Sequence, residues 1–306
     1  MTHPPPDPPT RQFLEHRELL FSVVYGMLGS VADTEDVLQE SWLAWHRRAT
    51  AADAEPVEHP RSYLVRVAVN AALARQDTIR RRRESYLGTW LPEPLLEEPA
   101  EDTDTHGGEA LSLALLVVLE TLSPLERAVF VLHEAFGFRH TEVAEILGRS
   151  PDATRQLAHR ARSHVRARRP RFRTEPRVHQ EVTERFVAAA LGGDLGALIE
   201  MLAPDATITV DGAGTPGAPR RPVRGRERVA RLVTGLAGRG SAREVHFQKV
   251  NDEPAAVVFS GDTVMGVMVL DLAPGGQQVR GIYAVFSPDK LAHLRSDATS
   301  VRKETP

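Results

Sequence analysis

The sequence contains no cysteine, and this absence excludes several kinds of chemistry. A chain without thiols forms no disulfide, holds no metal through thiolates and has no cysteine nucleophile. Long apolar runs are also missing, since no stretch approaches the ~20 residues that span a membrane. Residues 1–10 are proline-rich and lack the apolar core of a signal peptide. We therefore expect a globular protein of the cytoplasm.

A large excess of one sign of charge is missing too, because 38 basic and 41 acidic residues leave a net charge of −3. This balance excludes a uniformly basic coat for nucleic acid, but local basic segments exist. Residues 149–173 hold nine arginines and one acid, and residues 80–83 are all arginine. Residues 93–109 hold seven acids and no Lys or Arg, which is typical of an exposed linker.

The apolar pattern changes along the 306 residues, a length that predicts about two domains. Helical spacing covers the first part, whereas short β-like runs dominate after residue 177. The sequence therefore predicts an all-α part followed by an α+β domain. The expected helices are 11–28, 33–48, 60–83, four within 109–170, 178–191, 194–202 and 226–236, and the expected strands are 206–210, 245–250, 255–259, 264–272 and 278–286.

The strongest local signal is a helix-turn-helix over residues 141–162 (TEVAEILGRSPDATRQLAHRAR). A short helix ends at Gly148, and Ser150-Pro151 begins a second helix. We expect its core face to hold Ala153, Leu157, Ala161 and Val165. The opposite face would then offer arginine, glutamine and histidine to base edges and phosphates, with a solvated basic helix as the alternative. These DNA-binding candidates are Arg155, Gln156, His159, Arg160 and Arg162.

Helix 33–48 has two faces of different character. Val37, Ser41, Trp42 and Trp45 share one face, which is most simply a core face. Acidic and amide side chains surround a leucine on the other face, which would fit a protein partner with basic groups and an apolar pocket. These partner-binding candidates are Asp36, Gln39, Glu40, Leu43 and Arg47.

Helix 60–83 combines apolar positions such as Leu64, Val67, Ala71 and Ile79 with basic and amide side chains. A basic helix with an asparagine suits contact with a nucleic-acid backbone and with an unstacked base. Charge runs alone are usually solvated, so the run 80–83 is weak support. The candidates on this helix are Arg66, Asn70, Arg75, Arg80 and Arg81.

Four motifs in this order resemble the extracytoplasmic-function sigma factors of bacterial RNA polymerase. They are residues 33–42 (DTEDVLQESW), 60–70 (PRSYLVRVAVN), 122–130 (LSPLERAVF) and the helix-turn-helix. The resemblance covers most of residues 11–170, with a departure at residues 138–141 (FRHT), where the family more often has LSYE. It implies that the 36–42 stretch docks on the clamp of core polymerase and that the loop 49–59 and the helix after it read and melt the −10 element. It also implies that the second helix of the helix-turn-helix reads the −35 element.

Three further motifs resemble the sigma-J-type subgroup, which carries a fused C-terminal SnoaL-like domain. They are residues 90–94 (WLPEP), 211–215 (DGAGT) and 283–291 (YAVFSPDKL). We expect the glycine-rich loop to approach the 90–94 segment, because glycine permits close approach of another backbone. The expected regulatory residues between the domains are Trp90, Leu91, Pro92, Asp211, Gly212, Gly214, Tyr283 and Asp289.

The resemblance implies the following division: sigma region 2 at 11–84, an acidic linker at 85–108, sigma region 4 at 109–170, a SnoaL-like (NTF2-like) curved-sheet domain at 177–292, and a flexible tail at 293–306. Some SnoaL-like proteins are cyclases or isomerases that use Asp or His. Asp211 and His246 are the candidates here. A turn aspartate and a structural histidine explain them better, so we expect no catalysis, no cofactor and no metal.

The predicted function is a sigma factor that binds core RNA polymerase, recognises −35 and −10 promoter elements and is modulated by its own C-terminal domain. One alternative is a helix-turn-helix regulator that senses a ligand, and another is a bifunctional protein with a cyclase-like domain. The expected partners are core polymerase and promoter DNA, without a membrane, and an unidentified ligand in the C-terminal pocket is left open.

Overall fold

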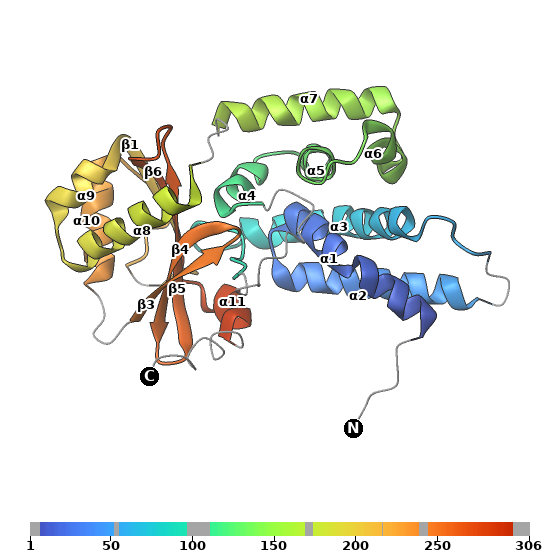
Figure 1. The fold of residues 1–306 in the computed structure, drawn as a ribbon, viewed down its shortest axis with the longest axis horizontal. Coiled ribbons are helices and arrows are strands. Elements are labelled where there is room, and N and C mark those ends of the chain that lie inside the picture. The colour runs from blue at the N-terminus through green and yellow to red at the C-terminus, as the bar shows by residue number, and fades with distance from the viewer. Residues whose placement is uncertain are drawn as a thin grey trace. The chain divides into compact units, whose positions relative to one another are not determined.

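The computed structural model describes residues 7–51, 55–96, 111–168, 174–215, 217–238 and 244–295 (Figure 1). The chain forms two compact units. The first unit comprises Met1–Glu84, His106–Glu109 and Val118–Arg169, and the second comprises Ser85–Thr105, Ala110–Val117 and Pro170–Pro306. Residues 97–108 of the expected linker and 296–306 of the expected tail lie outside the described residues.

The first unit begins with α1 (Pro8–Leu28), α2 (Val31–Thr50) and α3 (Pro60–Glu84), each packed on the other two. Helix α2 begins two residues before the predicted start at Asp33, because the Ser30 side chain accepts the Asp33 N–H at 3.3 Å and caps the helix. Trp45 is 2% exposed and donates its indole N–H to Pro9 O at 2.8 Å. Trp42 is only half-buried.

The same unit continues with α5 (Pro124–Phe130), a π-helical turn η1 (Val131–Ala135), α6 (His140–Leu147) and α7 (Pro151–Arg168). Helix α4 (Leu113–Leu119) precedes them. Ser123 and Glu126 form the predicted capping box at the start of α5. Gly148 ends α6 with φ at 62°, which confirms the predicted turn between the two helices.

Two predicted core faces are displaced around their helices. On α7 the buried side chains are Thr154, Ala158, Ala161 and Val165, whereas the expected Ala153 and Leu157 are half-buried. On α3 the core face is Leu64, Val65, Ala68, Val69, Ala72 and Ile79, with Val67 and Ala71 at its margin. Half of the predicted core residues are buried as expected, namely Ala161 and Val165 on α7 and Leu64 and Ile79 on α3, and each of the others lies one position before a buried residue.

A buried arginine joins the two helical groups within this unit. Arg127 on α5 is 4% exposed, donates to Gly26 O of α1 at 2.8 Å and pairs with Glu120 at 2.7 Å. Burial lowers the pKa of Arg127 to about 9. Arg83 of α3 pairs with the other oxygen of Glu120 and donates to Leu28 O at 2.6 Å. The helices predicted as regions 2 and 4 therefore share contacts in this structure.

The second unit is a six-stranded mixed sheet in the order β2-β1-β6-β5-β4-β3. Strands β1 and β6 are parallel, and every other neighbouring pair is antiparallel. The expected fold class is confirmed, and β2, α11 and η2 are additions to it. The elements are α8 (Pro176–Leu191), α9 (Leu195–Met201), β1 (Leu202–Asp211), β2 (Val223–Arg224), α10 (Arg226–Ala237), β3 (Glu244–Val250), β4 (Glu253–Ser260), β5 (Thr263–Leu272), β6 (Val279–Val285), α11 (Pro288–Leu291) and η2 (Ala292–Arg295).

Alternate residues of the central strands face two different apolar clusters, as the two-residue repeat of a strand requires. Ile282 and Ala284 of β6 join the cluster formed with α8, α9 and α10, which cover one face of the sheet (Figure 1). Val285 joins the second cluster, in which Leu91 and Leu113 pack on the opposite face. The chain segments that flank residues 97–110 therefore complete the core of the C-terminal domain.

The expected tail begins too early. Leu294 is 2% exposed and belongs to the second apolar cluster, so residues 293 and 294 are packed and do not form part of a free tail. Glu93, expected on an exposed linker, is 9% exposed. Across the described ranges, no helix combines the length and apolar character needed to cross a membrane.

Candidate functional site

The exposed face of α7 presents the four side chains expected to read DNA. Arg155, Gln156, His159 and Arg160 are all exposed. Arg155 pairs with Asp152 one turn earlier, and Arg160 Nε lies 3.0 Å from Glu126. Ion pairs at such exposed positions contribute about 0–1 kcal/mol, so DNA phosphates can replace the carboxylates at little cost.

Arg162, the fifth candidate on α7, is engaged within the unit. Its Nε lies 3.0 Å from Glu134 Oε1 on the π-helical turn, where the Glu134 side chain is 10% exposed. This pair joins α7 to the preceding turn. In this structure Arg162 therefore positions the helix and does not extend from its outer face.

On α3 the candidates for −10 contact fall into two groups. Arg66, Asn70 and Arg81 are exposed, and the Arg66 guanidinium lies 5.6 Å from the Tyr63 ring centre. Arg80 is also exposed and lies 3.2 Å from Asp77 and 3.8 Å from Glu84 on the same helix. These side chains are available to an anionic partner.

The acidic face of α2 is built against Arg75, which was expected to contact DNA. Asp36, Gln39, Glu40, Leu43 and Arg47 are all exposed, in agreement with the predicted helix face. Arg75 from α3 pairs with Asp36 at 2.8 Å and Glu40 at 2.5 Å, and the hydrogen bond that it donates to Asp36 raises the pKa of Arg75. Arg75 therefore holds two carboxylates in place, and it is not directed to a nucleic acid in this arrangement.

The most enclosed charged site of the described chain lies in the second unit, where Asp211 at the end of β1 meets the 86–91 segment. Asp211 is 0% exposed. Its Oδ1 accepts the Tyr86 hydroxyl at 2.5 Å, and its Oδ2 accepts the Leu91 N–H at 2.9 Å and the Lys290 ammonium at 2.6 Å. Lys290 also donates to Leu91 O. One carboxylate and one ammonium thus bind both backbone groups of Leu91.

Two aromatic rings enclose this ion pair. The Lys290 ammonium lies 3.2 Å from the Trp90 ring centre and 5.1 Å from that of Tyr86. The two rings meet edge to face at 5.0 Å. Burial, together with the hydrogen bond to Asp211, raises the pKa of Tyr86. The cation–π contact and the ion pair with Asp211 together offset the free-energy cost of removing the lysine ammonium from water.

The following residues are held by a second set of contacts. Asn251, at φ 53° in the turn after β3, accepts the Leu95 N–H through Oδ1 at 3.1 Å, and its own N–H donates to Leu95 O at 2.9 Å. His293 Nε2 lies 2.9 Å from Pro94 O, and Leu96 forms an isolated bridge with Val250. Thr89 Oγ1 also donates to Arg220 O at 3.4 Å, so the 86–96 segment, which we call the anchored linker, is bonded to five separate parts of its domain.

The glycine-rich loop approaches this linker as expected. Gly214 has φ at 77°, and a Cβ there would lie 3.2 Å from the Leu87 side chain. A Cβ on Gly212 would lie 2.6 Å from Ala218, so the loop itself requires that glycine. Leu91 and Pro92 are buried, and Trp90 is half-buried.

The third motif needs a correction. Tyr283 packs on the apolar cluster that contains Leu91, but Asp289 is exposed and forms no hydrogen bond with the anchored linker. Its neighbour Lys290, 3% exposed, makes the contact instead. Sequence reasoning also missed Tyr86, Asn251 and His293. The sequence did carry a signal for Lys290, because this lysine directly precedes a buried leucine in residues 283–291, the third motif that resembles the subgroup.

The two residues considered for catalysis do not meet. Asp211, Val285, Val267, Val257 and His246 stand in successive register across the sheet. Asp211 and His246 are therefore four strand spacings apart, about 19 Å along the sheet. His246 packs edge-on against Phe259 and lies 3.5 Å from Glu244. Within the described ranges, no group of three or more His, Cys, Asp or Glu residues gathers to hold a metal.

Comparison with protein families places these surfaces in context. Residues 13–85 match the family "Sigma-70 region 2", and residues 112–165 match "Sigma-70, region 4". The first match covers α2 and α3 with their acidic and basic faces. The second covers the capping box, the helix-turn-helix and most of α7.

Whole-chain relatives come from Mycobacterium tuberculosis. The chain is 40% identical over 293 residues to the ECF RNA polymerase sigma factor SigJ, covering 92% of both chains. It is 29% identical over 297 residues to the probable ECF sigma factor SigI, covering 95% of this chain and 97% of the relative. The crystal structure of M. tuberculosis SigJ matches with a TM-score of 0.70 and 33% identity, over 92% of this chain and 98% of that one.

Proposed function

The chain belongs to the extracytoplasmic-function RNA polymerase sigma factors, and we propose that its C-terminal domain controls promoter use by anchoring the linker between the two sigma regions. As a sigma factor, it binds core RNA polymerase and promoter DNA and directs transcription initiation. The proposal concerns which residues make those contacts and what the C-terminal domain adds.

For the sigma regions, three surfaces are assigned. The α2 face of Asp36, Gln39, Glu40 and Leu43 docks on core polymerase. Arg66, Asn70, Arg80 and Arg81 on α3 contact the −10 region, and Arg155, Gln156, His159 and Arg160 on α7 contact the −35 region. Two observations support this assignment. The side chains of all three surfaces are exposed, and the ion pairs that some of them form within the protein are weak. Arg75 and Arg162 act as positioning residues for these surfaces.

The division of the chain is proposed as 11–84 and 109–170 for the two sigma regions, close to the family matches at 13–85 and 112–165. The intervening linker, 85–108, has its described part fastened to the C-terminal domain. A free linker of about 24 residues would have a root-mean-square span of about 25–30 Å and would hold its ends loosely. Anchoring replaces this freedom by a fixed attachment.

The observation that carries the proposal is the buried set of bonds at Asp211. The fully buried Asp211 carboxylate accepts from Lys290 of its own domain and from Tyr86 and Leu91 of the anchored linker, so release of the linker removes two of its hydrogen-bond donors. Release would leave a charged pair without its aromatic enclosure. An anchored linker raises the effective concentration of one sigma region near the promoter once the other is bound, which increases promoter use.

We assign no reaction to the C-terminal domain, because its candidate acid is used in this anchor and its candidate base lies four strands away. The site of action is the cytoplasm, where core polymerase and promoters are found. An unidentified ligand in the C-terminal domain has no supporting observation in the anchored site, since its polar groups are occupied by the chain itself.

Run-off transcription with core polymerase tests this function. Trp90→Ala removes one aromatic wall of the Lys290 site and is expected to lower promoter output by about tenfold with unchanged core affinity. Trp90→Phe, which keeps an aromatic ring beside Lys290, is the control and should retain most of the promoter output. Equal output from the Trp90→Ala variant and the unsubstituted protein would overturn the anchoring proposal. Promoter-specific binding without core polymerase would favour the ligand-sensing regulator instead.

A further inference from the structure

A second charged surface lies on the C-terminal domain, away from the sigma regions in sequence. Residues 219–231 (PRRPVRGRERVAR) contain six arginines and one acid, Glu227, within a chain of net charge −3. The single acid is engaged, because it lies 3.6 Å from Arg231 one turn later on α10. This stretch therefore carries a local excess of five positive charges.

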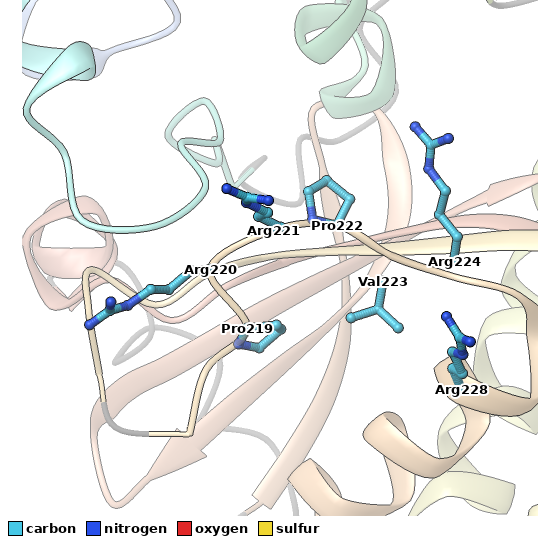
Figure 2. Close-up of a pocket in the computed structure, with 7 residues that line it drawn as sticks. All are labelled: Pro219, Arg220, Arg221, Pro222, Val223, Arg224 and Arg228. Atoms are coloured by element: carbon cyan, nitrogen blue, oxygen red, sulfur yellow. The ribbon is translucent and has the colours of Figure 1, made fainter.

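Four of these six arginines line a hollow of about 680 Å³ that is open to solvent (Figure 2). Its lining is Pro219, Arg220, Arg221, Pro222, Val223, Arg224 and Arg228. Figure 2 shows the guanidinium groups extending from the segment before β2, from β2 itself and from the first turn of α10. Four cationic groups thus border one shallow surface.

These four side chains are exposed, and none forms an ion pair among the described residues. By contrast, the exposed Arg155, Arg160 and Arg177 each lie beside a carboxylate. Grouping unpaired cations without an acid raises the local positive potential and attracts an anion. The cluster thus differs in character from a mixed, solvated surface.

The backbone that carries the cluster is fixed. Arg224 is paired with Thr207 of β1, which places it in the sheet. Arg228 lies one residue before Val229 and Ala230, both 0% exposed in the core of the domain. Pro219 and Pro222 restrict the connecting segment. Binding therefore orders only the arginine side chains and not the chain that holds them.

We propose that Arg221, Arg224 and Arg228 form a phosphate-binding surface for the backbone of promoter DNA, in addition to the −35 and −10 contacts. This inference rests on the proposed function, in which the chain is bound to polymerase at a promoter. The hollow offers guanidinium donors but no carboxylate, amide or hydroxyl side chain that could orient a small molecule. A continuous polyanion needs only such donors on an open face.

The test measures binding of the holoenzyme to a fluorescent promoter duplex between 50 and 300 mM salt. In one variant Arg221, Arg224 and Arg228 are all changed to Gln. In the matched control Arg177, Arg185 and Lys249 are changed to Gln, which removes the same charge from α8 and from β3 at the opposite edge of the sheet. Circular dichroism confirms the fold of both variants, and core affinity is measured first.

The patch variant is expected to bind about tenfold more weakly at 0.15 M salt, and its salt slope should fall by about three, one for each lost phosphate contact. The control should match the unsubstituted protein in both quantities. Equal affinity and slope for the patch variant and the control would overturn the proposal. If the unsubstituted chain forms no promoter-binding holoenzyme, the sigma-factor function itself fails, which is a different outcome.

Inorganic phosphate separates a DNA surface from a site for a free phosphorylated molecule. With the DNA surface proposed here, millimolar phosphate should give no saturable binding signal in calorimetry of the full chain. Saturable phosphate binding that the patch variant loses, together with unchanged DNA affinity, would overturn the assignment to DNA.

Discussion

The charged face of α2 with Arg75 and the charged site at Asp211 are chemically alike but differ in burial. Arg75 with Asp36 and Glu40 forms pairs in which the carboxylates are 61% and 54% exposed. Lys290 and Asp211 form a pair in which the side chains are 4% and 0% exposed. Solvent screens the first set and leaves it exchangeable, whereas the second set is costly to separate.

This difference matches two roles. A surface that must bind polymerase and DNA benefits from ion pairs that a partner can replace, because each replaced pair contributes little to folding. A contact that must hold a linker benefits from burial, since removing one partner leaves an uncompensated charge. Four experiments test this difference, and they follow in order of decreasing expected effect.

The largest effect is expected at the buried pair. Asp211→Asn should lower the free energy of unfolding of the C-terminal domain by about 3–5 kcal/mol, because Lys290 keeps its charge without a counter-ion. Lys290→Met in the same chain removes that charge and should restore most of the loss. Urea unfolding ranks the three proteins. A double variant as unstable as Asp211→Asn would show that the charge pair is not the source of the effect.

Substitutions on the polymerase-binding face of α2 should weaken binding to core polymerase without unfolding the protein. Glu40→Lys with Leu43→Asp should weaken core binding by at least about 100-fold, since both side chains are exposed and central to the face. Arg17→Gln is the control, because it breaks an exposed pair with Glu35 outside this face and should change core affinity by less than about threefold. An unfolded double variant in circular dichroism would instead identify these positions as core.

On α7, the arginines of the exposed face and the arginine that packs inside the unit should respond differently to substitution. Arg155→Ala with Arg160→Ala should lower promoter use by about 10- to 100-fold, since a base contact contributes about 1–3 kcal/mol, while core binding persists. Arg162→Ala should lower the melting temperature of the helical unit instead, because it loses the Glu134 pair. Unchanged promoter use by the Arg155, Arg160 variant would refute the assignment of α7 to the −35 element.

The smallest effect is expected at the capping box. Ser123→Ala should lower stability by about 1 kcal/mol at pH 7. Hydrogen bonds from Ser123, helped by Arg160, lower the pKa of Glu126. A carboxyl group whose pKa is lowered on folding stabilises the fold at neutral pH. This contribution is lost as the pH falls below 4.5, the usual pKa of a glutamate, and through the lower pKa that Glu126 has in the folded protein. The difference between variant and parent should therefore narrow in acid, which thermal melts at pH 7 and pH 3 can measure.

Local signals in the sequence predicted much of this architecture. The capping box at Ser123, the Gly148 turn and the five long strands were predicted from neighbouring residues, and the structure confirms them. The two-residue strand β2 was too short to stand out. Two of the four predicted core residues of α7, Ala153 and Leu157, were misplaced by one position because the alanines on both sides give no apolar contrast.

Contacts between distant residues were harder to foresee. The motifs indicated that residues 90–94 and 211–215 approach each other, and the structure has Leu91 N–H bonded to Asp211. They did not show that Lys290, 79 positions after Asp211, completes the site, and Asp289 was chosen instead. Pairing between charges so far apart depends on strand order and burial, which a single sequence does not display. Arg127 was missed for the same reason, since its partners lie on α1 and at Glu120.

Amide hydrogen exchange over residues 86–96 tests most directly whether the linker is a permanent part of the C-terminal domain. It is measured on the full chain, both free and bound to core polymerase. The account predicts that the amides of Leu91 and Leu95 exchange as slowly in both states as those of the neighbouring strand β1, since both amides donate to buried or half-buried acceptors. Exchange at the rate of an unstructured chain in the free protein would contradict the anchored linker.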